Sequence, residues 1–277
     1  MIRFENILAA QDVSDCSEQS LRAAVQLARD SGARLHEVYA HVLHDDPFTP
    51  TVAQDHMDQV RAALDDGVTL ATGTSELLDI KNVVLRDVSA ASAIVHHAAD
   101  NKIDLIVLGT HGRRGLRRMV LGSVAEEVVR MAGCAVLTVH PGDRTEILES
   151  DQEAEILLPL DFSKSSMAAV PLARELASMN RARLRVLHVV QETVYPAFYD
   201  AGAFSLYDAQ PDIEEHALAH LKEAYSRTAG PIVPVVFEVL VGHPAAEIAR
   251  RAEELGAGMI VMATHGLGGM AHHGQCR

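Results

Sequence analysis

The sequence has no tryptophan, and only 4% of its 277 residues are aromatic. Aliphatic side chains and alanine must therefore fill the interior, which is typical of helices packed on a parallel sheet. The longest apolar runs, such as those at residues 105–108 and 259–263, are far too short to cross a bilayer. The first residues also lack the long apolar segment of a secretory signal. These absences argue against a membrane-embedded or exported protein.

Cysteine and positive charge are also scarce. The three cysteines, Cys16, Cys134 and Cys276, are too widely spaced to indicate a disulfide framework, so we expect a reduced, cytoplasmic setting. The chain carries 38 acidic and 24 basic residues, a net charge of −14 at pH 7. This surplus of negative charge argues against a general nucleic-acid binder and against a protein that adheres to anionic membranes.

Segments with apolar residues at helical spacing alternate along the chain with short apolar runs. Strands alternating with helices predict a mostly parallel sheet with right-handed crossovers. In the first half we expect strands at 6–10, 35–42, 83–85, 105–109 and 135–139, and helices at 17–29, 51–70, 90–100 and 123–131.

The second half of the chain repeats the first after a charged linker. Asp161-Phe162-Ser163 follows a strand as Asp12-Val13-Ser14 does, and Thr264-His265-Gly266 repeats Thr110-His111-Gly112, each about 150 residues later. An internal repeat of this length predicts two domains of one fold. We place the first domain at 1–143, the linker at 144–154 and the second domain at 155–277. The second domain has expected strands at 156–160, 186–190, 233–241 and 259–263, and expected helices at 165–179, 213–229 and 245–255.

The second copy stops before the repeat is complete. Cys276 and Arg277 stand where the first copy has glycine and serine, and the helix and strand that follow Gly122 have no counterpart. An altered reading frame and a natural short form are both open as explanations. We therefore expect the second domain to be incomplete.

The stretch with the most specific chemistry is a glycine-bearing loop after the fourth strand. Gly109 and Gly112 open the loop, and Gly122-Ser123 closes it at the start of a helix. A strand, a glycine-bearing loop and a helix N-terminus together present backbone N–H groups and a positive dipole end to an anion. Ser123, with Glu126 three residues later, also fits a capping box, so Gly122-Ser123 has a second interpretation as a capped helix start.

These residues resemble the universal stress protein family, whose phosphate and ribose motif is G-x2-G-x9-G-[ST]. Gly109, Gly112, Gly122 and Ser123 match all four positions of that motif. The resemblance extends over both halves to about residue 269 and implies the family's tandem form. That form is α/β, with two Rossmann-like domains whose parallel five-stranded sheets are flanked by helices. Further matches are Asp12, Asp161, the His188-Val189 pair and the Gly242-x-Pro244 turn.

The resemblance implies an adenine-nucleotide site in the first domain, with ATP as the ligand, with or without Mg²⁺. Asp12 would hydrogen-bond adenine or ribose, as a short acceptor at the carboxyl end of a strand can. Backbone at Ala40 would touch the base, although a match on the His-Val pair would choose Val42 instead.

The same resemblance assigns the phosphate contacts to the glycine loop. Gly109 and Gly112 would line the ribose and phosphate path, while Gly122 N–H and Ser123 would hold the β- and γ-phosphates. Guanidinium groups suit phosphate geometry, although a solvated loop is the alternative for each arginine. The arginines concerned are Arg113, Arg114, Arg117 and Arg118.

The second copy departs from the motif. Ala263 replaces the first glycine, and the Gly-Ser pair that supplies the main phosphate donors is missing. Asp161, Val189 and Gly266 would form at most a weaker second site. We therefore expect one functional nucleotide site, in the first domain.

We expect a nucleotide-binding stress or signalling protein without a dedicated catalytic role. The sequence has no P-loop, no G-x-S-x-G elbow and no H-E-x-x-H motif. At most, the protein would hydrolyse ATP slowly or phosphorylate itself, with Ser123 as the acceptor. One alternative is a protein-interaction module in which nucleotide binding has lapsed.

Another alternative is a metal or redox sensor that uses His272, His273 and Cys276 near the end of the chain. A frayed terminal tail is the competing interpretation of these three residues. Elsewhere, we expect His96 and His97 to face solvent or phosphate rather than a metal, and Cys134 to be buried. No metal site is assigned from the sequence.

The last strand of the first copy also bears on assembly. In this family the last strand commonly pairs with its counterpart across a domain or subunit interface. The strand at 135–139 has no second-copy equivalent, and an unpaired edge invites another chain. We therefore expect a homodimer related by a two-fold axis, with protein partners that the sequence does not identify.

Overall fold

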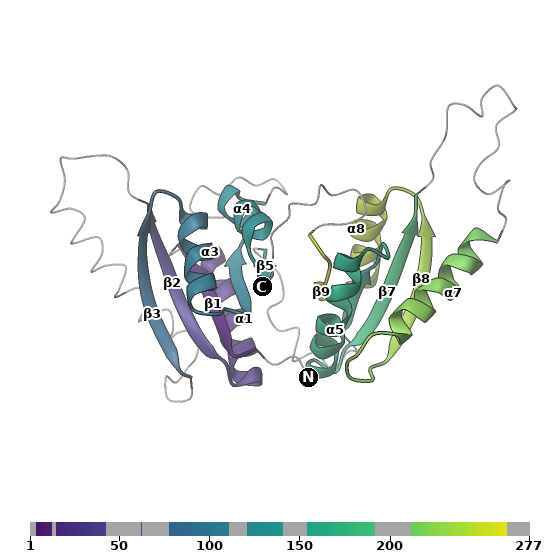
Figure 1. Ribbon diagram of the computed structural model, residues 1–277, viewed down its shortest axis with the longest axis horizontal. Coiled ribbons are helices and arrows are strands. Elements are labelled where there is room, and N and C mark those ends of the chain that lie inside the picture. The colour runs from purple at the N-terminus through teal and green to yellow at the C-terminus, as the bar shows by residue number, and fades with distance from the viewer. Residues whose placement is uncertain are drawn as a thin grey trace, which may run out of the picture. The chain divides into compact units, whose positions relative to one another are not determined.

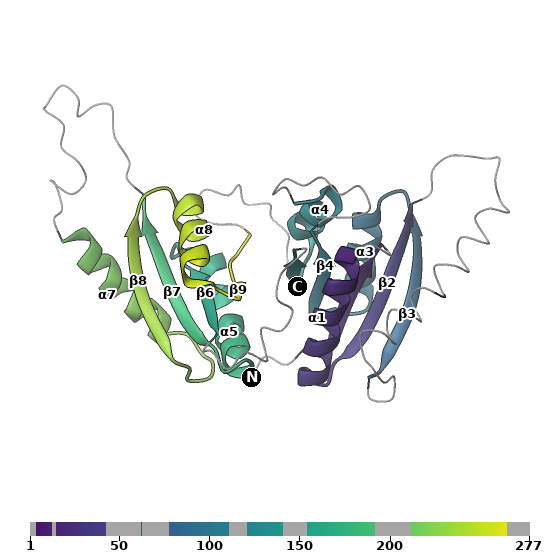
Figure 2. The same ribbon diagram turned by 180° about the vertical axis from the view of Figure 1, so that it is seen from behind.

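The computed structural model describes residues 4–12, 15–42, 62, 78–110, 121–140, 154–191 and 212–264. The chain divides into two units, Arg3–Thr145 and Glu146–Arg277, the latter joined by Met1–Ile2. Each unit contains its own parallel sheet flanked by helices (Figure 1, Figure 2). The predicted helix at 51–70 lies outside the described residues, apart from residue 62.

The first unit contains a five-stranded sheet. Its strands are β1 (Asn6–Gln11), β2 (Arg34–Val42), β3 (Ile80–Asp87), β4 (Leu105–Gly109) and β5 (Ala135–Val139). Its described helices are α1 (Asp15–Ser31), α3 (Ala90–Asp100) and α4 (Ser123–Met131). All strand pairs are parallel, in the order β3-β2-β1-β4-β5. The chain moves outward from β1 to β3 and then returns to the other side of β1, so the crossover direction reverses between β1 and β4.

Helix α1 covers one face of this sheet, and α3 and α4 cover the other (Figure 1, Figure 2). The central strands are apolar, and Ile7, Leu8 and Ile106 are fully buried. The helices contribute small side chains to the core, including Ala91 and Ala125. Small residues allow a helix to lie close to a sheet, so aliphatic side chains and alanine fill the interior, as the composition predicts.

The second unit repeats this arrangement with four described strands. They are β6 (Glu155–Pro159), β7 (Arg183–Val190), β8 (Val235–Val241) and β9 (Met259–Ile260), and the helices are α5 (Lys164–Met179), α7 (Ile213–Ser226) and α8 (Pro244–Leu255). The strand order β8-β7-β6-β9 matches β3-β2-β1-β4 of the first unit, and all pairs are parallel. The predicted duplication is therefore present in the fold.

Several element boundaries differ from the predicted ones. Strand β3 extends beyond the apolar residues 83–85, because its polar flanking residues also pair with β2. Strand β7 likewise begins earlier than predicted, at Arg183, because Arg183 and Arg185 form ion pairs with Glu155 on β6. Helix α7 ends at Ser226, ahead of the positive-φ residue Gly230, and strand β9 has only two residues.

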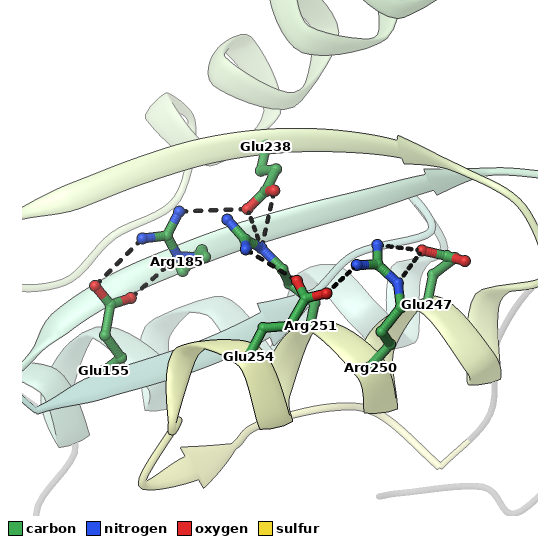
Figure 3. Close-up of polar contacts among 7 residues, drawn as sticks. All are labelled: Glu155, Arg185, Glu238, Glu247, Arg250, Arg251 and Glu254. Carbon is green, nitrogen blue, oxygen red and sulfur yellow. Dashed lines mark hydrogen bonds and ion pairs between the residues drawn. The ribbon is translucent and has the colours of Figure 1, made fainter.

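Charged side chains connect α8 to its sheet, and none of the residues of this helix is buried. Arg185 on β7 donates to Glu155 on β6 at 3.1 Å and to Glu238 on β8 at 3.3 Å (Figure 3). Arg251 on α8 donates to the same Glu238 carboxylate. The side chains of Arg185 and Glu155 are each only 12% exposed, so the centre of the network is largely shielded from water. The outer pairs of Arg250 lie in solvent, where an ion pair contributes little.

Glu238→Gln is expected to lower the free energy of unfolding by about 1–2 kcal/mol. The substitution removes the carboxylate that Arg185 and Arg251 share, and it leaves two partly buried cations close together. Chemical denaturation of the wild type and of Glu238→Gln measures the change in the free energy of unfolding. Glu254→Gln, at the exposed end of the network, is the control and should have a smaller effect; an equal loss in both variants would contradict this account.

Candidate functional site

Neighbouring strands of the first unit bring three of the predicted residues to one edge of the sheet. Gln11, the last residue of β1, pairs with Tyr39 on β2, so Asp12 follows beside Ala40. Strand β4 lies on the other side of β1 and ends at Gly109. Asp12, Ala40 and Gly109 are all partly exposed. The structure therefore places these residues on adjacent strands at the carboxyl edge.

This edge is also where the crossover direction reverses, between β1 and β4. In doubly wound sheets the connections at such a reversal leave the two strands toward opposite faces, and a crevice forms outside their carboxyl ends. Asp12 and Gly109 flank that reversal point. In open α/β sheets, ligands bind at such a position.

The glycine loop ends at the N-terminus of α4. Gly122 is the N-cap, with φ −60° and ψ 151°, and Ser123 is the first helical residue. No side chain makes a capping hydrogen bond there. The predicted capping box is therefore wrong: a serine must occupy the N-cap itself for its hydroxyl to reach the N3 amide, and Ser123 lies one position too late.

The available hydrogen-bond donors at this terminus also differ from the predicted ones. The Gly122 N–H donates to the Thr110 carbonyl at 2.7 Å, and the first intrahelical bond runs from the Glu126 N–H to the Gly122 carbonyl at 2.9 Å. The N–H groups of Ser123, Val124 and Ala125 have no partner within the described part of the chain. Three unpartnered amides at a helix N-terminus form an anion-binding arrangement.

The other predicted loop residues, Gly112 and Arg113, lie outside the described residues, as do the three further loop arginines. Their part in the site stays a prediction. Ser123 is exposed.

The corresponding edge of the second unit carries Asp161, which lies two residues after the end of β6. Its Oδ1 accepts the Ser163 N–H at 3.0 Å. Ser163 is the N-cap of α5, so the Asp161 carboxylate shapes the turn into that helix. Val189 lies near the end of β7, and Gly266 lies outside the described residues. A weaker second site at these three residues stays a prediction.

A histidine pair in the first unit was missed by the sequence analysis. Nδ1 of His36 on β2 and Nε2 of His97 on α3 lie 3.1 Å apart, and His36 is 3% exposed. The prediction that His97 faces solvent or phosphate is therefore wrong, whereas His96 is exposed. His97 follows Ile94 by three residues and precedes Ala98, so it shares their apolar face, and that spacing was the available signal.

The pKa of His36 is lowered to about 4, chiefly by burial and further by the neighbouring His97, Lys81 and Arg34, against the opposing effect of Asp79. Burial also lowers the pKa of His97, with Lys81 as a second cause. A neutral imidazole can donate to the other ring, whereas two protonated rings would repel each other. The pair is therefore neutral at pH 7.

Neither metal binding nor thiol chemistry is supported in the described residues. No group of three or more His, Cys, Asp or Glu side chains there is arranged to hold a metal ion. Burial raises the pKa of the Cys134 thiol to about 11, so it is a poor nucleophile at neutral pH. His272, His273 and Cys276 lie outside the described ranges. No helix in those ranges is long and apolar enough to span a membrane.

The fold defines a doubly wound α/β protein, and the strand order of its first unit reverses at the edge that holds Asp12 and Gly109. The chain matches the universal stress protein family over residues 3–140 and 154–273. It therefore belongs to the universal stress protein family, with two tandem copies of the family's domain.

Individual relatives agree with this assignment. The chain is 28% identical over 269 residues to universal stress protein Rv2005c of Mycobacterium tuberculosis, covering 92% of this chain and 86% of that protein. A solved universal stress protein from Archaeoglobus fulgidus shares the fold, with a TM-score of 0.63 at 16% identity over 94% of this chain and 86% of that one. Another solved universal stress protein, in complex with cAMP, is 25% identical with a TM-score of 0.42, covering 50% of this chain and 99% of that one.

Proposed function

We propose that the protein binds an adenine nucleotide, ATP in particular, in its first unit and acts in stress response or signalling without a dedicated catalytic role. The observation that carries this proposal is the set of three amides at the start of α4 that have no partner among the described residues, beside the strand ends at Asp12 and Gly109. The proposed site residues are Asp12, Ala40, Gly109, Gly112, Arg113, Gly122 and Ser123.

The proposed roles differ among these residues. Phosphates would accept from the amides of Ser123, Val124 and Ala125, because the Gly122 amide is already bonded to Thr110. Gly122 would serve as the N-cap and leave space for the phosphates. Asp12 and the backbone of Ala40 would contact ribose and adenine from β1 and β2. Mg²⁺ would enter the site bound to the phosphates of the nucleotide.

Titration calorimetry with ATP, cAMP and GTP on ligand-free protein tests the proposal. We expect ATP to bind, and Asp12→Ala to weaken binding by about tenfold because a hydrogen bond to a charged acceptor is lost. Asp161→Ala is the matched control, because its carboxylate shapes the turn into α5 of the second unit. An equal effect of both substitutions, or the absence of ATP binding in the wild type, would contradict the proposed site.

We also propose a cytoplasmic homodimer that forms through β5. This strand is an edge of the described first sheet, and its residues from Ala135 to Thr138 are partly exposed. Val124 and Met131 on α4 are exposed apolar side chains on the same unit. Sedimentation equilibrium should give twice the chain mass, and a monomeric mass would refute the dimer.

A further inference from the structure

Thr110 is a buried polar residue between β4 and the glycine loop. It is only 1% exposed, although it follows directly after Gly109 at the edge of the sheet. A buried hydroxyl requires a hydrogen-bond partner, because an unsatisfied polar group in the interior is costly. The hydrogen bonds of Thr110 therefore indicate its structural role.

The backbone of Thr110 connects the loop to two other elements. Its N–H donates to the Val139 carbonyl at 3.0 Å, which continues the β4–β5 ladder by one residue. Its carbonyl accepts the Gly122 N–H at 2.7 Å. One residue thus holds the end of β5 and the N-cap of α4, and residues 111–121 lie between Thr110 and Gly122 in the sequence.

The side chain of Thr110 adds a third connection. Its Oγ1 lies 3.0 Å from Nδ1 of His140, the residue that follows β5. Both backbone bonds and the side-chain bond therefore converge on the same residue. A residue held by three hydrogen bonds has little conformational freedom, so the side-chain bond helps to fix the direction of the Thr110 carbonyl.

We infer that Thr110, together with His140, is a positioning residue for the phosphate-binding amides of α4. The Thr110 carbonyl sets the place of Gly122, and Gly122 in turn sets the direction in which the amides of Ser123 to Ala125 point. Preorganised donors bind an anion better than donors that must first be ordered. This inference rests on the proposed function, because it names how that site is held rather than a second ligand.

The inference predicts a specific loss of phosphate binding. Thr110→Val keeps the branched shape but removes the hydroxyl, so we expect the Kd for ATP to rise about threefold to tenfold. The Kd for adenosine should stay unchanged, because adenosine has no phosphates for α4 to hold. Thr110→Ser retains the hydroxyl and should bind ATP as the wild type does. Thr138→Val makes the same chemical change on β5 away from the loop and is the control.

A double-mutant cycle with His140→Ala separates this role from general damage to the fold. If the side chains of Thr110 and His140 act as one unit, the double variant should have a Kd for ATP no higher than that of the single variant with the higher Kd. Unchanged ATP affinity in Thr110→Val, equal losses for ATP and adenosine, or additive effects in the cycle would each overturn the inference.

Hydrogen exchange distinguishes failure of the inference from failure of the proposed function. If the wild type binds neither ATP nor adenosine, the proposed function is wrong, and the positioning role is then judged in the ligand-free protein. The Gly122 amide should exchange about threefold to tenfold faster in Thr110→Val, while the Ile106 amide in β4 exchanges as in the wild type. An unchanged Gly122 rate would overturn the positioning role.

Discussion

Ser123→Glu is expected to weaken ATP binding by about 100-fold while leaving the first unit at least as stable as the wild type. Ser123 is the first residue of α4 and is exposed, so a carboxylate there would lie where the proposed site holds phosphates. Repulsion between close charges in partly shielded surroundings amounts to about 3 kcal/mol, which corresponds to roughly two orders of magnitude in affinity.

The opposite effect of this substitution on stability makes the result informative. A negative charge in the first turn of a helix interacts favourably with the helix dipole, so the melting temperature should stay the same or rise slightly. Loss of ATP binding with retained stability would therefore locate the phosphates at α4. Ser165→Glu, in the exposed first turn of α5 in the second unit, is the control and should leave ATP affinity unchanged. Retained ATP binding in Ser123→Glu would place the phosphates elsewhere.

The second large effect is a loss of stability in acid that arises from the His36–His97 pair. The pKa of His36 is about 4 in the folded protein, against 6.5 for an ordinary histidine. Between these two values the unfolded chain binds more protons than the folded one, so the free energy of unfolding falls as the pH drops from about 6.5 to 4. With about 1.4 kcal/mol for each pKa unit, His36 alone accounts for a loss of about 3 kcal/mol.

NMR titration of the imidazole resonances measures this effect directly. His36 should stay neutral until the pH falls well below 5, whereas the exposed His96 provides an internal comparison in the same helix as His97. His36→Leu combined with His97→Leu should remove most of this acid sensitivity in denaturation experiments between pH 7 and 4. An ordinary titration of His36 near pH 6.5 would contradict the buried pair.

The repeat allowed the fold to be predicted largely from the sequence, and the loop motif marked the strand end and the helix start beside the candidate site. Alternating apolar segments gave both parallel sheets, and α3, α4, β4 and β5 have the predicted boundaries. The G-x2-G-x9-G-[ST] spacing identified the loop because it marks a strand, a turn and a helix start within a short stretch. Local patterns of this kind depend on residues that are close in the sequence, so they can be recognised from the sequence alone.

The parts that the sequence did not predict depend on contacts between distant segments. The partner of the Gly122 amide is a carbonyl twelve positions earlier, so the spacing alone could not exclude Gly122 as a phosphate donor. The His36–His97 contact joins residues 61 positions apart. The extension of β7 to Arg183 similarly depends on carboxylates that reach it only after the sheet forms.

The central claim is that the first unit holds one adenine nucleotide per chain. The most direct measurement is to denature freshly purified protein, separate the released nucleotide by chromatography and determine its molar ratio to the chain. The account predicts about one adenine nucleotide per chain, or uptake of one added ATP if none is retained, with weaker binding in Asp12→Ala. A ratio of two would show that the second unit also binds, and no release together with no uptake of ATP would contradict the claim.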